Sequence, residues 1–208
     1  MQKQNAHRQK SILQKYIPED AVDIVYGWIT NHRLQLKITH ARKSKQGDYR
    51  PPVHHPYHRI SINNNLNQYA FLITLMHEMA HLEVWKRYKN SVRPHGKEWK
   101  KAFQELMKPF LSESVFPGEL LPVIHHHLTK GYASTVSDIQ LTRALLNYDG
   151  EGSMLVEDIP EMQIFSLHDG RLFRKKNRIR KRYLCYCFND KKTYLFSPAA
   201  RVKLHTGK

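Results

Sequence analysis

Two histidines and a glutamate stand close together in the segment LITLMHEMAHLEVWKRY. His77 and His81 are four residues apart, and Glu78 lies between them. In an α-helix, residues four apart share one face, so the two imidazoles can bind one Zn²⁺ ion at about 2.1 Å. Glu78 is rotated by about 100° from His77 and flanks the metal without binding it. There it can accept a proton from the metal-bound water, so the pattern predicts hydrolysis at a carbonyl group with Glu78 as general base and acid.

A core helix that happens to carry two histidines is the alternative interpretation. Leucine, isoleucine, methionine, valine and tryptophan residues surround the motif on both sides. Burying two imidazoles and a carboxylate in such an apolar helix without a partner is costly in free energy. The sequence therefore favours a metal site over a purely structural role.

A catalytic zinc site needs a third protein ligand and keeps one position open for water. His95 is one candidate, because the loop after the helix is long enough to return to the zinc-binding face. Pro94 restricts the chain before His95, and Gly96 lets it turn into the next helix. Glu98 and Glu105 are rival candidates, since glutamate also serves as a zinc ligand.

These residues need a scaffold of helices and strands. The motif helix is expected from about residue 66 to 88, after a cluster of asparagines that favours a helix start. Alternation of apolar and polar residues predicts strands at 34–38 and 59–62, and the composition of residues 45–48 predicts a turn. Helical spacing and start signals predict the other helices at about 18–29, 96–108, within 116–128 and after 137.

The chemistry of the chain changes after a linker at Asp149–Ser153. Residues 163–204 alternate and contain turn dipeptides, which predicts a small antiparallel sheet of roughly three or four strands. Two domains are therefore expected, residues 1–150 and residues 151–208.

The chain is strongly basic. It contains 34 Lys and Arg residues against 18 Asp and Glu, a formal net charge of +16. Such a charge attracts polyanions, above all nucleic acid. Residues 171–182 contain eight of the basic residues, and aromatic residues follow them. The candidates for phosphate contact are Arg174, Lys175, Lys176, Arg178, Arg180 and Arg182. A two-faced sheet with solvated charges is the alternative.

Other potential metal ligands are interpreted as structural or solvated. Cys185 and Cys187 are one residue apart, so a disulfide between them would be strained, and reduced thiols are expected. A second metal site that combines them with His168 and His205 is conceivable, but hydrophobic packing is favoured. The adjacent histidines at 54–55 and 125–127 point in different directions and are interpreted as surface polar residues.

The segments THARKSKQGDYR, HRISINNNL, LMHEMAHLEVWKRY and RPHGKEWKKAF resemble the SprT-like zinc metallopeptidase domain, which is shared with the DNA–protein-crosslink protease Spartan. The resemblance covers about residues 19–110. It implies peptide-bond hydrolysis, one catalytic Zn²⁺ held by His77, His81 and His95, and Glu78 as the catalytic glutamate. The family analogy and the charge of the chain together favour substrates that are associated with or crosslinked to DNA, and the charge pattern places the expected DNA contact in the basic C-terminal region.

The resemblance also implies a fold. We expect an α+β, zincin-like domain whose HExxH helix packs against a small antiparallel sheet. By analogy with zincins, the strand at Arg59–Ile62 is expected to be the edge that pairs with an extended substrate. Relatives often end in a zinc ribbon with two cysteine pairs, whereas this chain has one pair. The C-terminal sheet is therefore expected to be a degenerate ribbon that persists without metal.

Three further points remain expectations. The oxyanion-stabilising group is not distinguished among His58, Tyr88, Arg93 and Lys97. No apolar run approaches the ~20 residues of a membrane span, and the basic N-terminus lacks the apolar core of a signal peptide, so a cytoplasmic protein without a membrane partner is expected. The alternative function is a non-catalytic, zinc-containing nucleic-acid-binding module, but a structural zinc site has no need of Glu78.

Overall fold

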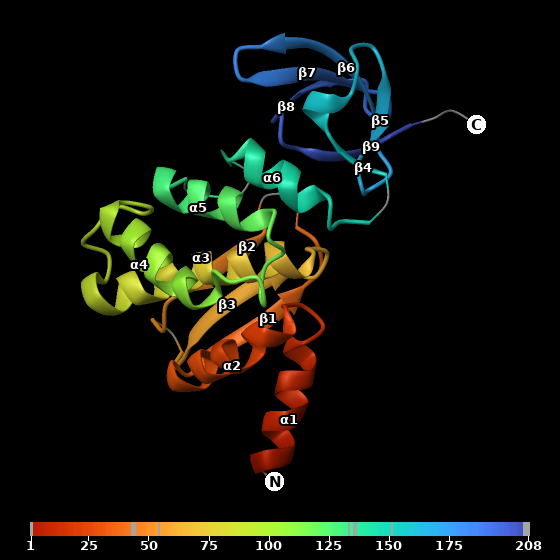
Figure 1. Ribbon diagram of the computed structural model, residues 1–208. Coiled ribbons are helices and arrows are strands. Elements are labelled where there is room, and N and C mark those ends of the chain that lie inside the picture. Colours follow the sequence, from red (N-terminus) through yellow and green to blue (C-terminus); the bar gives the residue numbers. More distant parts are fainter. Residues whose placement is uncertain are drawn as a thin grey trace. The chain divides into compact units, whose positions relative to one another are not determined.

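The structure is a computed structural model that describes residues 2–42, 45–53, 55–132, 134, 137–150 and 152–205. Its contacts divide the chain into two compact units, Met1–Ala133 and Ser134–Lys208. Together the described residues form a mixed α+β protein with two sheets (Figure 1). His54, one of the histidines interpreted above as surface residues, lies outside the described residues.

In the first unit, helices pack around a three-stranded sheet. Its elements are α1 (Gln2–Leu13), η1 (Glu19–Ala21), α2 (Val22–Asn31), β1 (Leu34–Thr39), β2 (Gly47–Arg50), β3 (His58–Asn63), α3 (Gln68–Tyr88), α4 (Lys97–Met107), η2 (Lys108–Phe110) and α5 (Leu120–Lys130).

The sheet of this unit is mixed, so the expectation of a purely antiparallel sheet is wrong. The strand order is β1-β3-β2, with β3 parallel to β1 and antiparallel to β2. The chain leaves β1, forms β2 at the far edge, and then returns through the centre as β3. A connection of that length lets β3 run in the same direction as β1.

This order also corrects the position of the expected edge strand. Arg59–Ile62 lies in β3, which is paired on both sides and cannot accept another strand. The strand that pairs on one side and contacts α3 is β2. Its first residue, Gly47, falls in a segment whose composition had indicated a turn.

Helix α3 is the central helix of the unit. The side chain of Asn67 accepts a hydrogen bond from the backbone N–H of Ala70 and so caps its start. Burial extends around most of its circumference between Ala70 and Leu82, because the sheet covers one side and α4 covers another. Its partners include Ile60 and Ile62 of β3, which are completely buried.

Helix α4 presents one apolar face. Trp99, Phe103 and Met107 recur at four-residue spacing and are buried, while polar residues such as Lys101 and Glu105 lie between them. This spacing places Trp99 and Phe103 beside α3, where they contact the motif helix.

The second unit contains α6 (Ile139–Leu146) and a six-stranded antiparallel sheet with the order β4-β9-β5-β6-β7-β8. Its other elements are β4 (Ser153–Leu155), η4 (Val156–Asp158), β5 (Ile164–Ser166), β6 (Leu172–Ile179), β7 (Arg182–Cys187), β8 (Thr193–Phe196) and β9 (Arg201–Leu204). The short strands β4 and β5 raise the strand number above the expected three or four. The core is apolar and includes Phe165, Phe173 and Val202.

Helix α6 belongs to this second unit. The guanidinium group of Arg143 binds Asp158 at 2.8 Å and Glu157 at 3.1 Å, which joins α6 to η4. The two compact units therefore divide before α6, whereas the composition-based boundary falls after it, at residue 150. None of the helices that the structure describes is both long and apolar enough to cross a membrane.

Candidate metal centre

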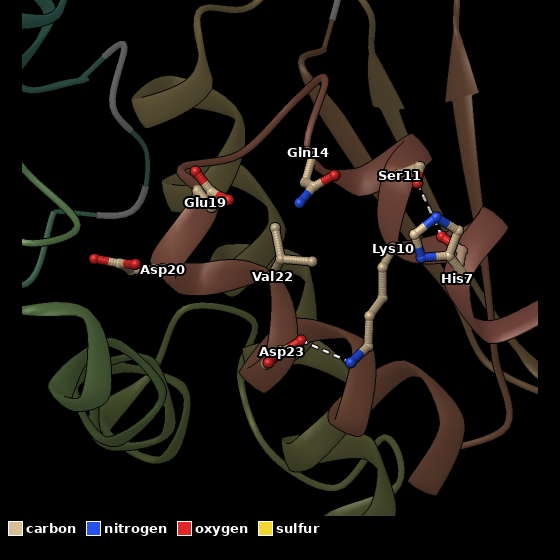
Figure 2. Close-up of a pocket in the computed structure, with 8 residues that line it drawn as sticks. All are labelled: His7, Lys10, Ser11, Gln14, Glu19, Asp20, Val22 and Asp23. Carbon is tan, nitrogen blue, oxygen red and sulfur yellow. Dashed lines mark hydrogen bonds and ion pairs between the residues drawn. The ribbon is translucent and has the colours of Figure 1, made fainter. Parts of the chain in front are cut away.

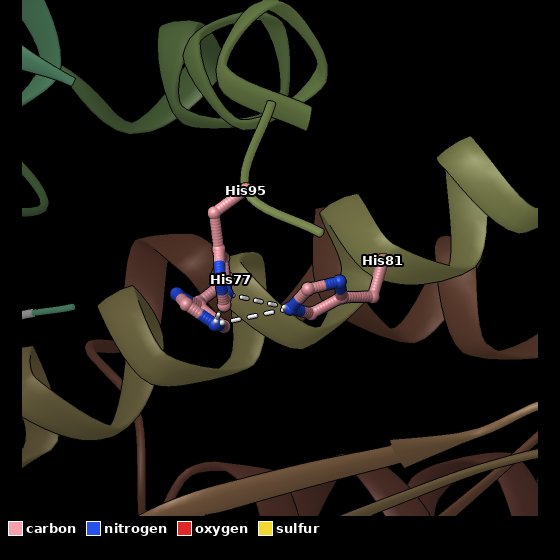
Figure 3. Close-up of side chains that lie close together, drawn as sticks. All are labelled: His77, His81 and His95. Atoms are coloured by element: carbon pink, nitrogen blue, oxygen red, sulfur yellow. Dashed lines mark hydrogen bonds between the residues drawn. The ribbon is translucent and has the colours of Figure 1, made fainter. Parts of the chain in front are cut away.

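Three histidine side chains meet beside α3 (Figure 3). His77 and His81 project from successive turns of α3, and His95 approaches from the loop before α4. Their Nε2 atoms form a nearly equilateral triangle: His77 to His81 is 3.2 Å, His81 to His95 is 3.1 Å, and His95 to His77 is 3.2 Å. The predicted helix pair and the predicted loop histidine are thus brought together.

The triangle has the dimensions of a metal site. Three nitrogen ligands of one tetrahedral zinc ion, each at about 2.1 Å, lie about 3.4 Å from one another. Neutral imidazoles at this spacing either share protons or surround a cation, because their lone pairs would otherwise repel. The donor set and its spacing therefore fit a divalent cation such as zinc.

Burial keeps the three imidazoles neutral. Desolvation, followed by the charge of the neighbouring histidines, lowers the pKa of His77 to about 3 and that of His81 to about 4. Desolvation also lowers the pKa of His95. All three imidazoles are consequently neutral near neutral pH, and each can offer one ring nitrogen as a ligand.

Trp99 forms an aromatic wall behind the triangle. Its ring centroid lies 4.6 Å from that of His77, 4.8 Å from that of His95 and 5.6 Å from that of His81. The indole N–H donates to the backbone carbonyl of His77 at 3.4 Å. Trp99 therefore limits the rotation of all three imidazoles, a role that sequence reasoning did not assign.

His95 occupies its place through an unusual backbone conformation. Its φ is 56°, in the left-handed region that few non-glycine residues adopt, although histidine is among the more tolerant. The expected flexible turn at Gly96 is thus displaced by one residue, because Gly96 instead caps α4 in an extended conformation. Backbone strain of this kind concentrates at functional sites.

The rival ligands lie elsewhere. Glu98 interacts with Lys97, and Glu105 is hydrogen bonded to Lys108 at 2.8 Å. Among the residues that the structure describes, the one group of histidine, cysteine or carboxylate side chains close enough to share a metal is His77, His81 and His95.

Glu78 lies next to the histidines on α3 but points toward β2. Its side chain is 7% exposed, and the backbone N–H of Tyr49 in β2 donates to its carboxylate. Burial, and secondarily the charge of Asp48, raise the pKa of Glu78 to about 7, against smaller opposing effects that include the Tyr49 N–H and Arg42. A carboxyl group with this pKa can both accept and return a proton near neutral pH.

Arg42 fixes the chain that leads into β2. Its guanidinium group donates to the side chain of Asn63 at 2.8 Å, to the hydroxyl of Ser61 at 3.0 Å, and to the backbone carbonyls of Ser61 and Gln46. The Asn63 amide in turn donates to the carbonyl of Lys45 at 2.9 Å. The start of β2 is therefore joined to the central strand β3 by side-chain hydrogen bonds as well as by the sheet.

The candidates for oxyanion stabilisation are dispersed. His58 is hydrogen bonded to the hydroxyl of Tyr49 at 2.9 Å and lies against Trp85, and its pKa is lowered mainly by burial. Tyr88 is 41% exposed, and the side chain of Lys97 is almost fully exposed. The carbonyl of Arg93 accepts a hydrogen bond from Gly96 in the loop that carries His95.

The predicted basic residues of the C-terminal unit do not all face solvent. Arg174 and Lys176 lie over the rings of Phe188 and Tyr186, at 5.1 and 5.5 Å. Arg178, Arg180 and Arg182 are exposed at the β6–β7 hairpin. Lys175 is 3% exposed, because the alternation of β6 turns it into the core, so it cannot contact nucleic acid.

Lys175 has internal partners instead. Its ammonium group donates to the carbonyls of Glu157 at 3.0 Å and Ile159 at 2.5 Å, and it lies 4.0 Å from the ring centre of Tyr183. Cys185 and Cys187 are free thiols buried in the same core. In the described part of this unit, no group of three or more histidine, cysteine or carboxylate side chains lies close enough to share a metal.

His127 departs from the interpretation of residues 125–127 as surface residues. It is 2% exposed, stacks on Tyr132 and contacts Phe103 edge to face. Its charge contributes to the lowered pKa of His77, which places it near the metal centre. Only the period of α5, which buries Ile124 and Leu128 as well, distinguishes it from its exposed neighbours.

A separate pocket of about 340 Å³ lies between α1 and the start of α2 (Figure 2). Its polar lining includes Lys10 and Asp23, which form an ion pair at 2.7 Å. None of the three histidines lines it, so it is not part of the metal centre.

The fold and the histidine triangle define an α+β protein with a candidate metal centre on a HExxH helix. The model of the SprT-like family matches residues 10–120, which include all three histidines, Glu78 and β2. The match spans more than half of the chain, and the protein belongs to the SprT-like family. No curated protein and no solved structure gave a significant match.

Proposed function

We propose that this protein is a zinc-dependent endopeptidase. The observation that carries the proposal is the convergence of three neutral imidazoles, two of them from α3, with a buried carboxylate next to them in the sequence of that helix. His77, His81 and His95 would hold the ion through their Nε2 atoms. When bound, zinc would supply Lewis-acid polarisation and make a water molecule more acidic.

The chain's own residues would move the proton. Glu78 accepts it from the attacking water and passes it to the leaving amine as the peptide bond breaks. Burial raises the pKa of Glu78 above its usual range, which favours exchange of a proton near neutral pH. A purely structural zinc site would not require a buried carboxylate at this position, which argues against the non-catalytic alternative.

The strand β2 is the proposed substrate edge. It pairs with β3 on one side only, and it contacts α3 beside Glu78. An extended polypeptide that adds to β2 would lie along the helix that carries the metal ligands. Extended or unfolded segments of proteins are therefore the expected substrates.

The direct test compares wild-type protein with Glu78→Gln. Both are expected to bind one zinc ion, since the three histidines are unchanged. Cleavage of an unstructured protein should fall about 100-fold or more in the variant, because general acid–base catalysis is lost. Zinc stoichiometry by elemental analysis and cleavage products by mass spectrometry provide the measurements. Equal cleavage by the two proteins would contradict the proposal.

We also propose that nucleic acid brings substrates to this enzyme. Half-buried and exposed basic residues of β6 and the β6–β7 hairpin lie among aromatic rings, and such a surface can neutralise phosphates and stack on bases. The residues are Arg174, Lys176, Arg178, Arg180 and Arg182. Proteins associated with DNA are the corresponding substrates.

Charge variants of the full-length chain test this second proposal. Replacing Arg174, Lys176 and Arg178 with glutamine should weaken binding to DNA. The slope of log affinity against log salt concentration should become less steep by about 3, because three phosphate contacts are lost. The control replaces the exposed residues Arg8, Lys15 and Lys37 with glutamine, which removes the same charge from the other unit. An equal loss in both variants would show that net charge, and not this surface, governs binding.

A further inference from the structure

We infer that Gly47 is a positioning residue for Glu78. Because glycine has no side chain, the edge strand β2 can lie directly against the Glu78 carboxylate and orient it. The inference rests on the proposed function, in which Glu78 transfers protons. It assigns a second task to β2, which both offers a substrate edge and supports the general base.

The contact is unusually close. A Cβ atom placed on Gly47 would lie 2.4 Å from Oε1 of Glu78, 2.8 Å from its Cγ and 2.9 Å from its Cδ. These distances are far below the 3.5–4.0 Å of normal contact between nonbonded carbon atoms. Any side chain at position 47 would therefore occupy the volume of the Glu78 side chain, and rotation of the terminal carboxylate alone would not resolve the overlap.

Neither partner can withdraw easily. Glu78 is 7% exposed and is held from the strand side by the backbone N–H of Tyr49, two residues beyond Gly47. Gly47 is paired with Ile62 in the sheet, and Arg42 fixes the preceding residue through the carbonyl of Gln46. The strand and the carboxylate therefore determine each other's position.

Gly47→Ala would consequently displace the carboxylate while leaving the three histidines in place. A misplacement of about 1 Å in a catalytic group can lower the rate about 100-fold. We expect a loss of that order in kcat, with unchanged affinity for zinc measured by competition with a chromophoric chelator. The split between kcat and zinc affinity separates a positioning role from general damage to the site.

The chain offers a matched control. Gly27 in α2 has no atom within 4 Å of the position where a Cβ would be added. Gly27→Ala should leave both peptidase activity and zinc affinity unchanged. A similar loss of activity in Gly27→Ala and Gly47→Ala would overturn the inference, because the effect would then not depend on the contact with Glu78.

Thermal unfolding of the zinc-free protein provides a test that is independent of activity. Gly47→Ala should lower Tm in the wild-type background but have little effect in Glu78→Ala, where the new methyl group enters the vacated volume. Equal decreases in the two backgrounds would refute the proposed contact. If the wild-type protein cleaves no substrate, the proposed function fails, and the Tm comparison still decides whether Gly47 places Glu78.

Discussion

At the scale of the single residue, the buried carboxyl group of Glu78 makes the free energy of unfolding depend on pH. Its pKa is raised from 4.5 to about 7. Between these two pH values the native protein therefore keeps a proton on Glu78, whereas the unfolded chain has released it. This contribution to the free energy of unfolding is present below pH 4.5 and is lost as the pH rises through about 7. Glu78→Gln removes it.

Zinc-free Glu78→Gln should therefore gain stability relative to wild type as the pH rises from 5 to 8. The full pKa shift corresponds to about 3 kcal/mol. Urea unfolding of both proteins at the two pH values measures the difference, and the histidine contributions cancel because both proteins share them. A difference that stays constant with pH would contradict the assigned environment of Glu78.

His95 provides a second prediction at this scale. Its left-handed backbone conformation costs an alanine about 1 kcal/mol, whereas glycine adopts it without strain. Both His95→Ala and His95→Gly should lose tight zinc binding, but His95→Gly should be the more stable of the two without zinc. Chemical denaturation of the two variants tests the ordering, and the opposite order would show that this backbone conformation is not strained.

At the scale of the element, the connection into β2 depends on one side chain. Arg42→Ala removes hydrogen bonds to Asn63, Ser61 and Gln46. We expect the free energy of unfolding to fall by about 2 kcal/mol, because a charged donor is lost and polar acceptors are left unpaired. Calorimetry measures the loss. Arg42→Lys should recover only part of it, since lysine cannot reproduce the planar set of donors.

The helices and the strands β1 and β3 could be predicted from local patterns, but the pairing of the strands could not. The apolar spacing of α3 and α4 and the motif histidines are local signals, and the structure places both helices close to the expected bounds. The direction of β1 relative to β3 and the edge position of β2 arise from long-range pairing, which no local pattern encodes. Gly47 was interpreted as a turn residue. The close contact that requires a glycine there is made with Glu78, which is distant in the sequence, so no local pattern indicates it.

The basic stretch shows the same limit on a smaller scale. Composition marked Lys175 as one of several cations, but the period of β6 decides which of them face solvent. Phe173 and Lys175 share the buried face, and Arg174 and Lys176 share the other. To predict that Lys175 is buried, one would have to know which residues of the strand face the core. The irregularity between Lys175 and Arg178 interrupts the alternation that would show this.

At the scale of the whole molecule, the two units predict separable properties. Residues 1–133 contain the three histidines, Glu78 and β2. A fragment of these residues should bind zinc with the affinity of the full chain and should lose most nucleic-acid binding, because the basic β6–β7 surface is absent. Zinc titration and DNA titration of the fragment provide the test. Loss of zinc binding from a fragment with native circular dichroism would contradict it.

The positions of the functional residues along the chain have a consequence for the order of assembly. The three metal ligands come from one continuous stretch, His77 to His95, whereas the contact between Gly47 and Glu78 requires the sheet to have formed across a long loop. Closing short loops is entropically cheaper and faster than completing non-local strand pairing. During refolding the chain should therefore capture its ion first and acquire a competent general base later, passing through a metal-loaded but inert state.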